Sequence, residues 1–274
     1  MKKFFILTIC ALFIGVMPAF AWGKLGHATI AKIAEDHLTP KAKKVIDKYL
    51  DGKSIIEYAS YPDFYRDIHL IDLGFEPTNS PRITVWGHSF QANNDGTLYL
   101  SERRGNEYVK NCLLRIQPII EDFKANHRNM TDSARVVSLA YIVHIVGDIH
   151  CPKHIRYEDE PSSGRYPINV MNEKKGISYH TYWDAIILNS YHSWGYSDLA
   201  SLLDRHNNKE RKEIAKGTLL DWAAENARES RYTVSRQKGH TISRAEANID
   251  IKHAHRQIIR AGYRLAALLN EITK

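Results

Sequence analysis

Features of membrane-embedded and repetitive chains are largely missing from this sequence of 274 residues. Beyond residue 21 it has no apolar run long enough to cross a bilayer, which excludes a later membrane-spanning helix. It also has no internal repeat, no low-complexity tract and no convincing pair of strands. Cysteine occurs only three times, and one of the three, Cys10, lies in the apolar N-terminal stretch.

The N-terminal stretch has the three parts of a secretory signal peptide, which predicts residues 1–21 to be a leader. Met1-Lys2-Lys3 is basic, residues 4–16 are apolar, and Ala19-Phe20-Ala21 places small residues where a signal peptidase cleaves. We therefore expect cleavage between Ala21 and Trp22. Residues 22–274 would then be exported, to the periplasm or outside the cell, as one domain. The alternative is a retained N-terminal anchor, although the apolar run is short for one.

Charge and cysteine content leave more than one interpretation open. The formal net charge of +7 at pH 7 suits an anionic substrate but is also ordinary for a soluble protein. Export permits a disulfide between the two remaining cysteines, Cys112 and Cys151. Because sequence does not show whether they are close enough, two separate buried thiols are an equal alternative.

Apolar residues recur at helical spacing along nearly the whole chain. The fold class that this pattern predicts is all-α, a single mainly helical domain with long functional loops. Helices are expected at about 24–38, 40–50, 53–69, 107–126, 131–148, 178–190, 197–205, 208–229 and 244–272. Turn-forming residues punctuate 71–105 and 150–177, which are predicted to be the two long loops.

The segment from His144 to His154 carries the densest group of metal-binding residue types. His144 and Asp148 are four residues apart at the end of a predicted helix, so they share one of its faces. One such pair is usually a surface or capping pair. This helix is strongly apolar, however, and a charge buried in it needs a partner or a metal ion. His154 follows Pro152, which stops the helix and allows the chain to fold back.

A second pair with the same spacing, His180 and Asp184, follows in a later predicted helix. Imidazole and carboxylate are ligands that zinc accepts, and two such pairs can be directed into one cleft. Trp22 would begin the mature chain, where its α-amino nitrogen and carbonyl oxygen can chelate a metal together with His27. The remaining candidates are Asp63 with Arg66 one turn later, and His88 in the first long loop.

In their order and spacing, these residues resemble the zinc-dependent single-strand nucleases of the S-one/P-one type. The resemblance covers essentially all of residues 22–274. The matching motifs are Trp22 with His27, Tyr61-Pro62-Asp63-x-x-Arg66, Trp86-Gly87-His88, His144 to His154 with Cys151 for Gln and Lys153 for Leu, His180-x-x-Trp183-Asp184, and Ala261 to Asn270.

The resemblance implies a cofactor of three zinc ions per chain. The ligands of the first would be Asp63, His88, His144 and Asp148. The ligands of the second would be the backbone amino nitrogen and carbonyl oxygen of Trp22, His27 and the other oxygen of Asp148. The ligands of the third would be His154, His180 and Asp184.

The resemblance also implies a reaction, in which a zinc-bridged hydroxide attacks phosphorus. The third zinc would stabilise the leaving 3′ oxygen, Arg66 would stabilise charge on the phosphoryl oxygens, and Asp63 would help orient the nucleophile. The implied activities are endonuclease cleavage of single-stranded RNA and DNA to 5′-phosphorylated products, and 3′-nucleotidase action. The expected partners are therefore these substrates, and no obligate protein partner is evident.

The chain departs from the family where bases would be recognised. Ser89 follows His88 where relatives often have an aromatic residue, and the family's Gly-Gly-Asn element after His154 is missing. The aromatic residues that could offer stacking faces instead, or be plain packing, are Phe90, Tyr157 and Tyr166. His150 is expected to support the ligands or the fold rather than bind metal.

Two other functions remain open. Zinc-dependent bacterial phospholipase C has a related three-zinc site, but it tends to have a longer gap after the N-terminal Trp and a Glu at the position of Asp184. The altered loop after His154 keeps this alternative open. A non-catalytic zinc-binding or nucleic-acid-binding protein could retain the site for stability, but this hypothesis gives Arg66 no obvious structural duty.

Overall fold

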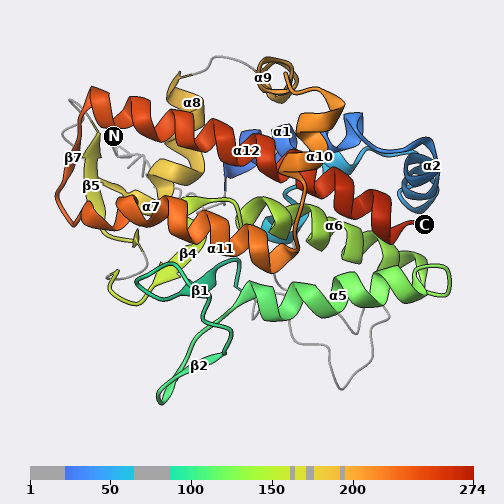
Figure 1. The fold of residues 1–274 in the computed structure, drawn as a ribbon, viewed down its shortest axis with the longest axis horizontal. Helices are drawn as coiled ribbons and strands as arrows, with labels where there is room; N and C mark the ends of the chain where they lie inside the picture. Colours follow the sequence, from blue (N-terminus) through green and yellow to red (C-terminus); the bar gives the residue numbers. More distant parts are fainter. Residues whose placement is uncertain (1–21, 65–86, 161–163, 171–175, 192–194) are drawn as a thin grey trace, which may run out of the picture.

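The computed structural model describes residues 22–64, 87–160, 164–170, 176–191 and 195–274. The predicted leader, Arg66 and Trp86 lie outside the described residues. The prediction of a mainly helical fold is confirmed, and long helices run side by side along the longest axis of the molecule (Figure 1). Within the described part, none of the helices is both long and apolar enough to cross a membrane.

Helix α6 (Asp132–Asp148) lies at the centre of the fold because it is apolar on nearly all sides. Every residue from Val137 to Asp148 is buried. The helices that pack against α6 include α1 (Gly23–Asp36), α5 (Cys112–Asn126) and α12 (Arg244–Ile272). The long helix α12 also packs along α1, as Figure 1 shows. Of the smaller helices, α2 (Pro40–Tyr49) packs on α12 and α9 (Tyr196–Leu203) packs on α1.

Side-chain caps explain where several helices begin. Thr131 accepts a hydrogen bond from a backbone N–H in the first turn of α6, and Thr39 does the same for α2. Ser243 and Glu246 form a capping box at the start of α12. Helices α2, α6 and α12 therefore lie where the apolar periodicity predicts them.

Other predicted helices are divided. Instead of one helix over 53–69, the structure has α3 (Ile55–Tyr58) and α4 (Tyr61–Phe64). The predicted helix 208–229 is broken into α10 (Asn208–Ile214) and α11 (Leu219–Ser230), because Gly217 has a φ of 93° and Thr218 caps a new helix. The segment 178–190 contains α7 (Tyr179–Thr181), a π-helical turn (Tyr182–Ile186) and α8 (Ile187–Tyr191). The helix predicted to start at 107 starts at Cys112, where Asn111 caps it.

The expectation of no strand pairs is wrong, because short strands order the long loops. Strand β1 (Phe90–Ala92) pairs in parallel with β4 (Ile155–Tyr157), which joins the two loops next to His88 and His154. A hairpin is formed by β2 (Arg103–Arg104) and β3 (Glu107–Tyr108). The third sheet places β5 (Pro167–Val170) between β6 (Ile177–Ser178) and β7 (Thr241–Ile242).

Candidate metal centre

Asp148 is fully buried at the end of α6 and is the central residue of a group of ligands. Its Oδ2 lies 3.2 Å from Nε2 of His144, one turn earlier on the helix, and 3.4 Å from Nδ1 of His88. Its other oxygen, Oδ1, lies 3.3 Å from Nε2 of His27 on α1. The two oxygens of one carboxylate therefore face different histidines.

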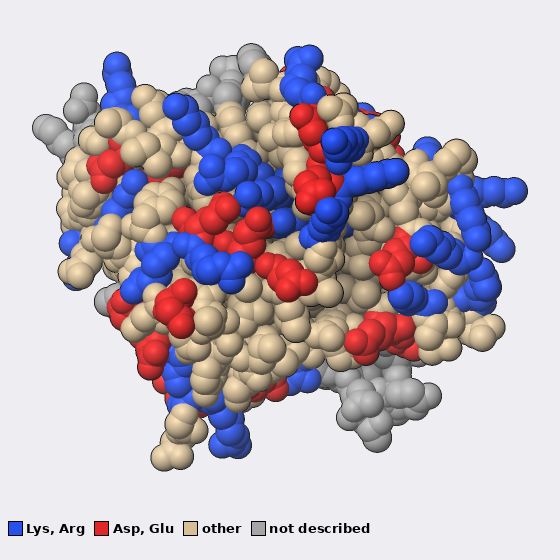
Figure 2. All heavy atoms as spheres, in the orientation of Figure 1, with Lys and Arg blue, Asp and Glu red and all other residues tan. Residues whose placement is uncertain are grey.

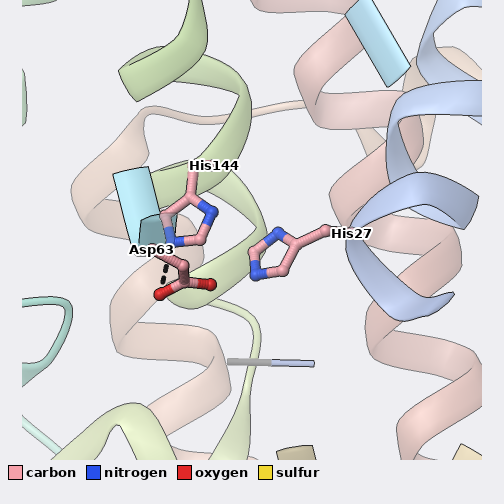
Figure 3. A group of neighbouring side chains, drawn as sticks. All are labelled: His27, Asp63 and His144. Atoms are coloured by element: carbon pink, nitrogen blue, oxygen red, sulfur yellow. Dashed lines mark ion pairs between the residues drawn. The ribbon is translucent and has the colours of Figure 1, made fainter. Parts of the chain in front are cut away.

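Asp63 completes this group from α4. Its Oδ1 lies 3.3 Å from Nδ1 of His88 and 3.8 Å from Nε2 of His144. Figure 3 shows the Asp63 carboxylate and the His27 and His144 rings directed toward one another from three separate helices. The backbone carbonyl of Ala59 accepts a hydrogen bond of 2.8 Å from Nδ1 of His144, so Nε2 of this ring is the atom available to a ligand.

His27 is held between α6 and the ring of His144. The two imidazoles stack with their centroids 4.2 Å apart. A Cβ atom at Gly147 would lie 2.8 Å from Nδ1 of His27, so glycine is required there for the ring to approach α6. The indole of Trp22 is also buried against this turn and donates a hydrogen bond of 3.0 Å to the carbonyl of Gly147. Together these contacts bring the start of α1 to the ligand group.

A second group lies beside the first and contains His154, His180 and Asp184. His154 donates from Nδ1 to the carbonyl of His88 at 2.6 Å, which leaves Nε2 directed at Oδ1 of Asp184, 3.8 Å away. Nδ1 of His180 and Oδ2 of Asp184 approach to 2.7 Å without the geometry of a hydrogen bond. The π-helical turn carries Asp184, and such turns are frequent at functional sites.

The donor atoms of these groups fit metal coordination. For ligand bonds of 2.0–2.1 Å, neighbouring donors of a tetrahedral zinc site are separated by about 3.3 Å. The separations around Asp148 are close to this value. The buried atoms of this site that make no hydrogen bond within the described part of the chain include both ring nitrogens of His27, both oxygens of Asp148 and Nε2 of His154. Because an unsatisfied buried polar atom costs about 1–3 kcal/mol, these donors fit a bound cation.

The electrostatics of the first group also fit a cation. Burial acts to raise the pKa of Asp63, but His144 and His88 outweigh it and lower this pKa to about 2. Burial acts to lower the pKa of His144, but Asp148 and Asp63 raise it to about 9. The carboxylates therefore stay ionised and draw a proton onto His144, at the position where a metal ion would supply the positive charge instead.

In the second group burial dominates. It raises the pKa of Asp184 to about 6 and lowers the pKa of His154 to about 3. Both residues are thus pushed toward their neutral forms, since the low-dielectric surroundings disfavour charge. A bound cation would reverse this preference for Asp184.

Several other predicted site residues lie elsewhere or have other contacts. Arg66 is outside the described residues, so its predicted role stays a prediction. The hypothesis of a disulfide is wrong: Cys112 and Cys151 are both free and buried. His150 donates to the carbonyl of Val146 and accepts from Arg264, which agrees with its predicted structural role.

The aromatic residues proposed to stack bases are instead part of the core. Phe90, Tyr157 and Tyr166 are 0%, 4% and 7% exposed. The hydroxyl of Tyr157 donates to the carbonyl of Ala227, and that of Tyr166 donates to the carbonyl of Arg236. With so little of each ring exposed, these three residues offer no open stacking face in this structure, and their predicted role stays a prediction.

One member of the second group was missed by sequence reasoning. The Cys151 sulfur lies with one donor atom each of His154 and Asp184 in a set whose atoms are all within 4.8 Å of one another. The position of Cys151, three residues before His154, could have indicated a ligand. The sequence predicts only a disulfide or a separate buried thiol for it.

A mainly helical fold with buried histidine and aspartate groups defines a helical metalloprotein. The family model described as S1/P1 nuclease matches residues 22–274, so the chain belongs to this family of metal-dependent enzymes. The match includes every predicted ligand and begins at Trp22, the expected first residue after cleavage.

Curated relatives agree with this membership at low identity. The chain is 22% identical over 207 residues to Endonuclease 5 of Arabidopsis thaliana, covering 69% of this chain and 63% of the relative. It is 24% identical over 186 residues to Endonuclease 4 of the same plant, covering 63% and 57%. It is 22% identical over 175 residues to Nuclease P1 of Penicillium citrinum, covering 60% and 57%. The matches thus span less than two thirds of the length of these relatives.

Proposed function

We propose that this protein is a zinc-dependent nuclease. It would cleave single-stranded RNA and DNA to 5′-phosphorylated products and also act as a 3′-nucleotidase. The observation that carries the proposal is the buried Asp148 carboxylate, whose two oxygens face His27 on one side and His144 and His88 on the other. A carboxylate placed in this way can bridge two metal ions, and paired metals suit phosphodiester hydrolysis.

Three zinc ions would be held by the groups described above. The first would take Asp63, His88, His144 and Asp148, the second the Trp22 backbone, His27 and Asp148, and the third His154, His180 and Asp184. When bound, the ions supply Lewis acidity that activates water and stabilises negative charge on the phosphate. The carbonyls of Ala59 and His88 fix the tautomers of His144 and His154, so each ring presents its Nε2.

Residues of the chain would do the remaining work. Asp63 would accept a proton from the attacking water or orient it, because its carboxylate stays ionised beside His144 and His88. Arg66 follows Asp63 by three residues and would stabilise the phosphoryl oxygens. Because the pKa of Asp63 is low, its carboxylate is better suited to orient the attacking water than to keep the proton of that water.

Contacts with a polymer would come from the β2–β3 hairpin rather than from the buried aromatics. Tyr108 is 50% exposed, Arg103 is exposed, and the guanidinium of Arg104 lies 4.5 Å from the centre of the Tyr99 ring. Figure 2 shows Lys and Arg side chains where this hairpin projects. A base can stack on an exposed aromatic ring while basic side chains follow the phosphates.

Export is the proposed location, with cleavage between Ala21 and Trp22. The start of the family match at Trp22 supports this boundary. Cleavage would free the α-amino group of Trp22, the residue before α1, whose backbone nitrogen lies beside the Cys151 sulfur.

The decisive experiment offers the purified mature chain, residues 22–274, three substrates: single-stranded DNA, RNA and phosphatidylcholine. We expect both nucleic acids to be cleaved, the lipid to stay intact, and a chelator to abolish cleavage. Cleavage of the lipid alone would replace the proposal with a phospholipase C. Binding of zinc without any hydrolysis would favour a non-catalytic protein.

The matched variants for this experiment lie on the same helix. Because loss of an outer-sphere partner costs 10–100-fold, loss of the bridging ligand in Asp148→Asn should lower kcat/KM by at least about 100-fold and reduce bound zinc. Asp132→Asn changes an exposed carboxylate at the start of α6 and should leave both values unchanged. Equal activity of Asp148→Asn and the unchanged protein would refute the bridging role.

A further inference from the structure

The sulfur of Cys151 lies within the second ligand group although its residue follows the end of α6. Cys151 is fully buried, and its Sγ is 3.7 Å from Oδ1 of Asp184. The sulfur, one His154 nitrogen and one Asp184 oxygen all lie within 4.8 Å of one another. Three different kinds of zinc ligand therefore surround one small volume.

The separation of sulfur and oxygen fits a shared ion. A tetrahedral zinc with bonds of about 2.3 Å to sulfur and 2.0 Å to oxygen places these two atoms about 3.5 Å apart. The observed 3.7 Å needs only a small adjustment. An S–H donor bonded to Asp184 gives a similar distance, so the separation alone does not choose between the two roles.

Neighbouring atoms favour a cation in the volume that the Cys151 sulfur borders. Nε2 of His154, Nδ1 of His180 and Oδ2 of Asp184 are buried and make no hydrogen bond within the described part of the chain. These three residues are 3%, 3% and 1% exposed. A thiol bonded to Asp184 Oδ1 would satisfy none of these atoms, whereas one cation between them would satisfy all three.

Two backbone N–H groups lie beside the Cys151 sulfur, those of Lys153 and Trp22. Hydrogen bonds from N–H groups to a metal-bound sulfur are the outer contacts that orient such a ligand. The relatives' pattern has Gln at this position, a side chain that cannot supply a thiolate.

We propose that Cys151 is a thiolate ligand of the metal ion held by His154, His180 and Asp184, an inference that rests on the proposed metal site. The bond from Sγ to the metal forms as the S–H bond breaks, and the proton leaves to solvent. Four protein donors would leave the ion no open position, as in tightly held structural zinc sites. A phosphate oxygen would reach this ion only by expanding the shell to five ligands.

X-ray absorption at the zinc edge tests the proposal in the unaltered mature chain. We expect zinc–sulfur scattering at about 2.3 Å, with one sulfur for every three bound zinc ions. Fully loaded protein with nitrogen and oxygen scatterers alone would overturn the inference and leave Cys151 as a hydrogen-bond donor to Asp184. A chain that binds no metal at all would overturn it together with the proposed function.

Cobalt substitution provides a second test with a matched control. The cobalt-loaded protein should show a near-ultraviolet thiolate-to-metal charge-transfer band, which Cys151→Ser removes and Cys112→Ser retains. Cys112 is the other free buried cysteine, so it controls for loss of a thiol from the core. A band that survives Cys151→Ser, or is missing from the unaltered protein, contradicts the assignment.

An assay of single-stranded DNA hydrolysis distinguishes a failure of the thiolate assignment from a failure of the proposed nuclease function. Cleavage without zinc–sulfur scattering would reject the thiolate ligand and keep the nuclease. Zinc–sulfur scattering without cleavage of any nucleic acid would keep the ligand and reject the nuclease.

Discussion

Gly147 is a residue whose missing side chain matters as much as any ligand. It precedes Asp148 on α6, and the ring of His27 occupies the space where a Cβ would lie. The ring also stacks on His144, which limits where it can move. The position therefore couples helix packing directly to ligand geometry.

The variant Gly147→Ala should separate folding from metal binding. Alanine favours a helix over glycine by about 1 kcal/mol, so helix propensity alone predicts a more stable protein. The clash at 2.8 Å with Nδ1 of His27 should instead displace this ligand and lower the zinc content by up to one ion per chain. Metal analysis of the dialysed protein measures the effect.

Gly195→Ala is the control for this variant. Gly195 has a negative φ of −74°, and the nearest atom to a new Cβ is 3.5 Å away on Asp198. Zinc content should be unchanged. A Gly147→Ala protein with full zinc content would mean that His27 is not a ligand in the arrangement described.

At the scale of elements, the β2–β3 hairpin is the proposed contact for a polymer. Its base is tied to the loop of His88: Gln91 donates to the carbonyl of Lys110, and Gly87 lies against the Lys110 side chain. Under the proposed function, a strand bound at the exposed hairpin would continue toward the loop of His88.

The double variant Arg103→Ala with Tyr108→Ala should affect long substrates only. Loss of one stacked base costs about 1–3 kcal/mol, which corresponds to about 5–150-fold in KM for single-stranded DNA. Removal of one phosphate contact should also weaken the salt dependence. Hydrolysis of a 3′-mononucleotide, which has no further nucleotides to bind at the hairpin, should keep its kcat/KM.

Lys124→Ala provides a charge control on α5, where the side chain is exposed and pairs with Glu271. If this variant weakens polymer cleavage as much as the hairpin variant does, net charge rather than the hairpin explains the effect. If the hairpin variant lowers mononucleotide hydrolysis equally, the loop of His88 has been disturbed instead.

Elements with many local signals were predictable from the sequence. Helices α6 and α12 have continuous apolar periodicity and side-chain caps at their starts, so local pattern and tertiary burial agree. The break at Gly217 was missed because the apolar pattern resumes on its far side. Strands β1 and β4 were missed because each has three residues and pairs with a segment far away in the chain.

The same distinction applies to the site. His144 with Asp148, and His180 with Asp184, follow from a four-residue spacing that local structure preserves. His27, Asp63 and His88 come from elements whose meeting depends on packing around α6, so the family resemblance rather than any spacing connected them. The burial of Tyr157 depends in the same way on distant segments, because β4 pairs with β1 and the Tyr157 hydroxyl bonds to Ala227.

At the scale of the whole molecule, Trp22 and Gly23 are part of the core. Trp22 is fully buried, and a Cβ at Gly23 would lie 2.7 Å from the carbonyl oxygen of Asp184. The N-terminal amino group would therefore be placed among the ligands once the leader is removed. Leader cleavage would then be an activation step, since an amide nitrogen does not coordinate as a free amine does.

One extra alanine before Trp22 should lower zinc content by one ion and reduce cleavage of single-stranded DNA strongly, by about 100-fold on the scale of ligand losses. The same alanine added after Lys274 is the control and should have no effect. Activity equal to that of the mature chain would refute the role of the amino group.

The stability of the whole fold should depend on pH through His253, which joins α11 to α12. It is 3% exposed, and its Nδ1 accepts a hydrogen bond of 2.9 Å from Arg256. Its Nε2 then donates to Ser230 at 2.9 Å, an arrangement that needs the neutral ring. Burial, with Arg256 and Arg260, lowers the pKa of His253 to about 3.

The pKa of His253 in the folded protein is below the usual 6.5, so the unfolded chain binds more protons between pH 6.5 and about 3. The free energy of unfolding therefore decreases as the pH is lowered through this window. At pH 5 the loss from this one residue is about 2 kcal/mol. The variant His253→Gln should be less stable at pH 7, yet lose about 2 kcal/mol less than the unaltered protein between pH 7 and pH 5. Urea unfolding of the metal-free proteins at the two pH values measures this difference, and the ligand histidines contribute equally to both proteins. Identical losses would mean that His253 can be protonated inside the fold, so that the contact between α11 and α12 does not depend on its charge.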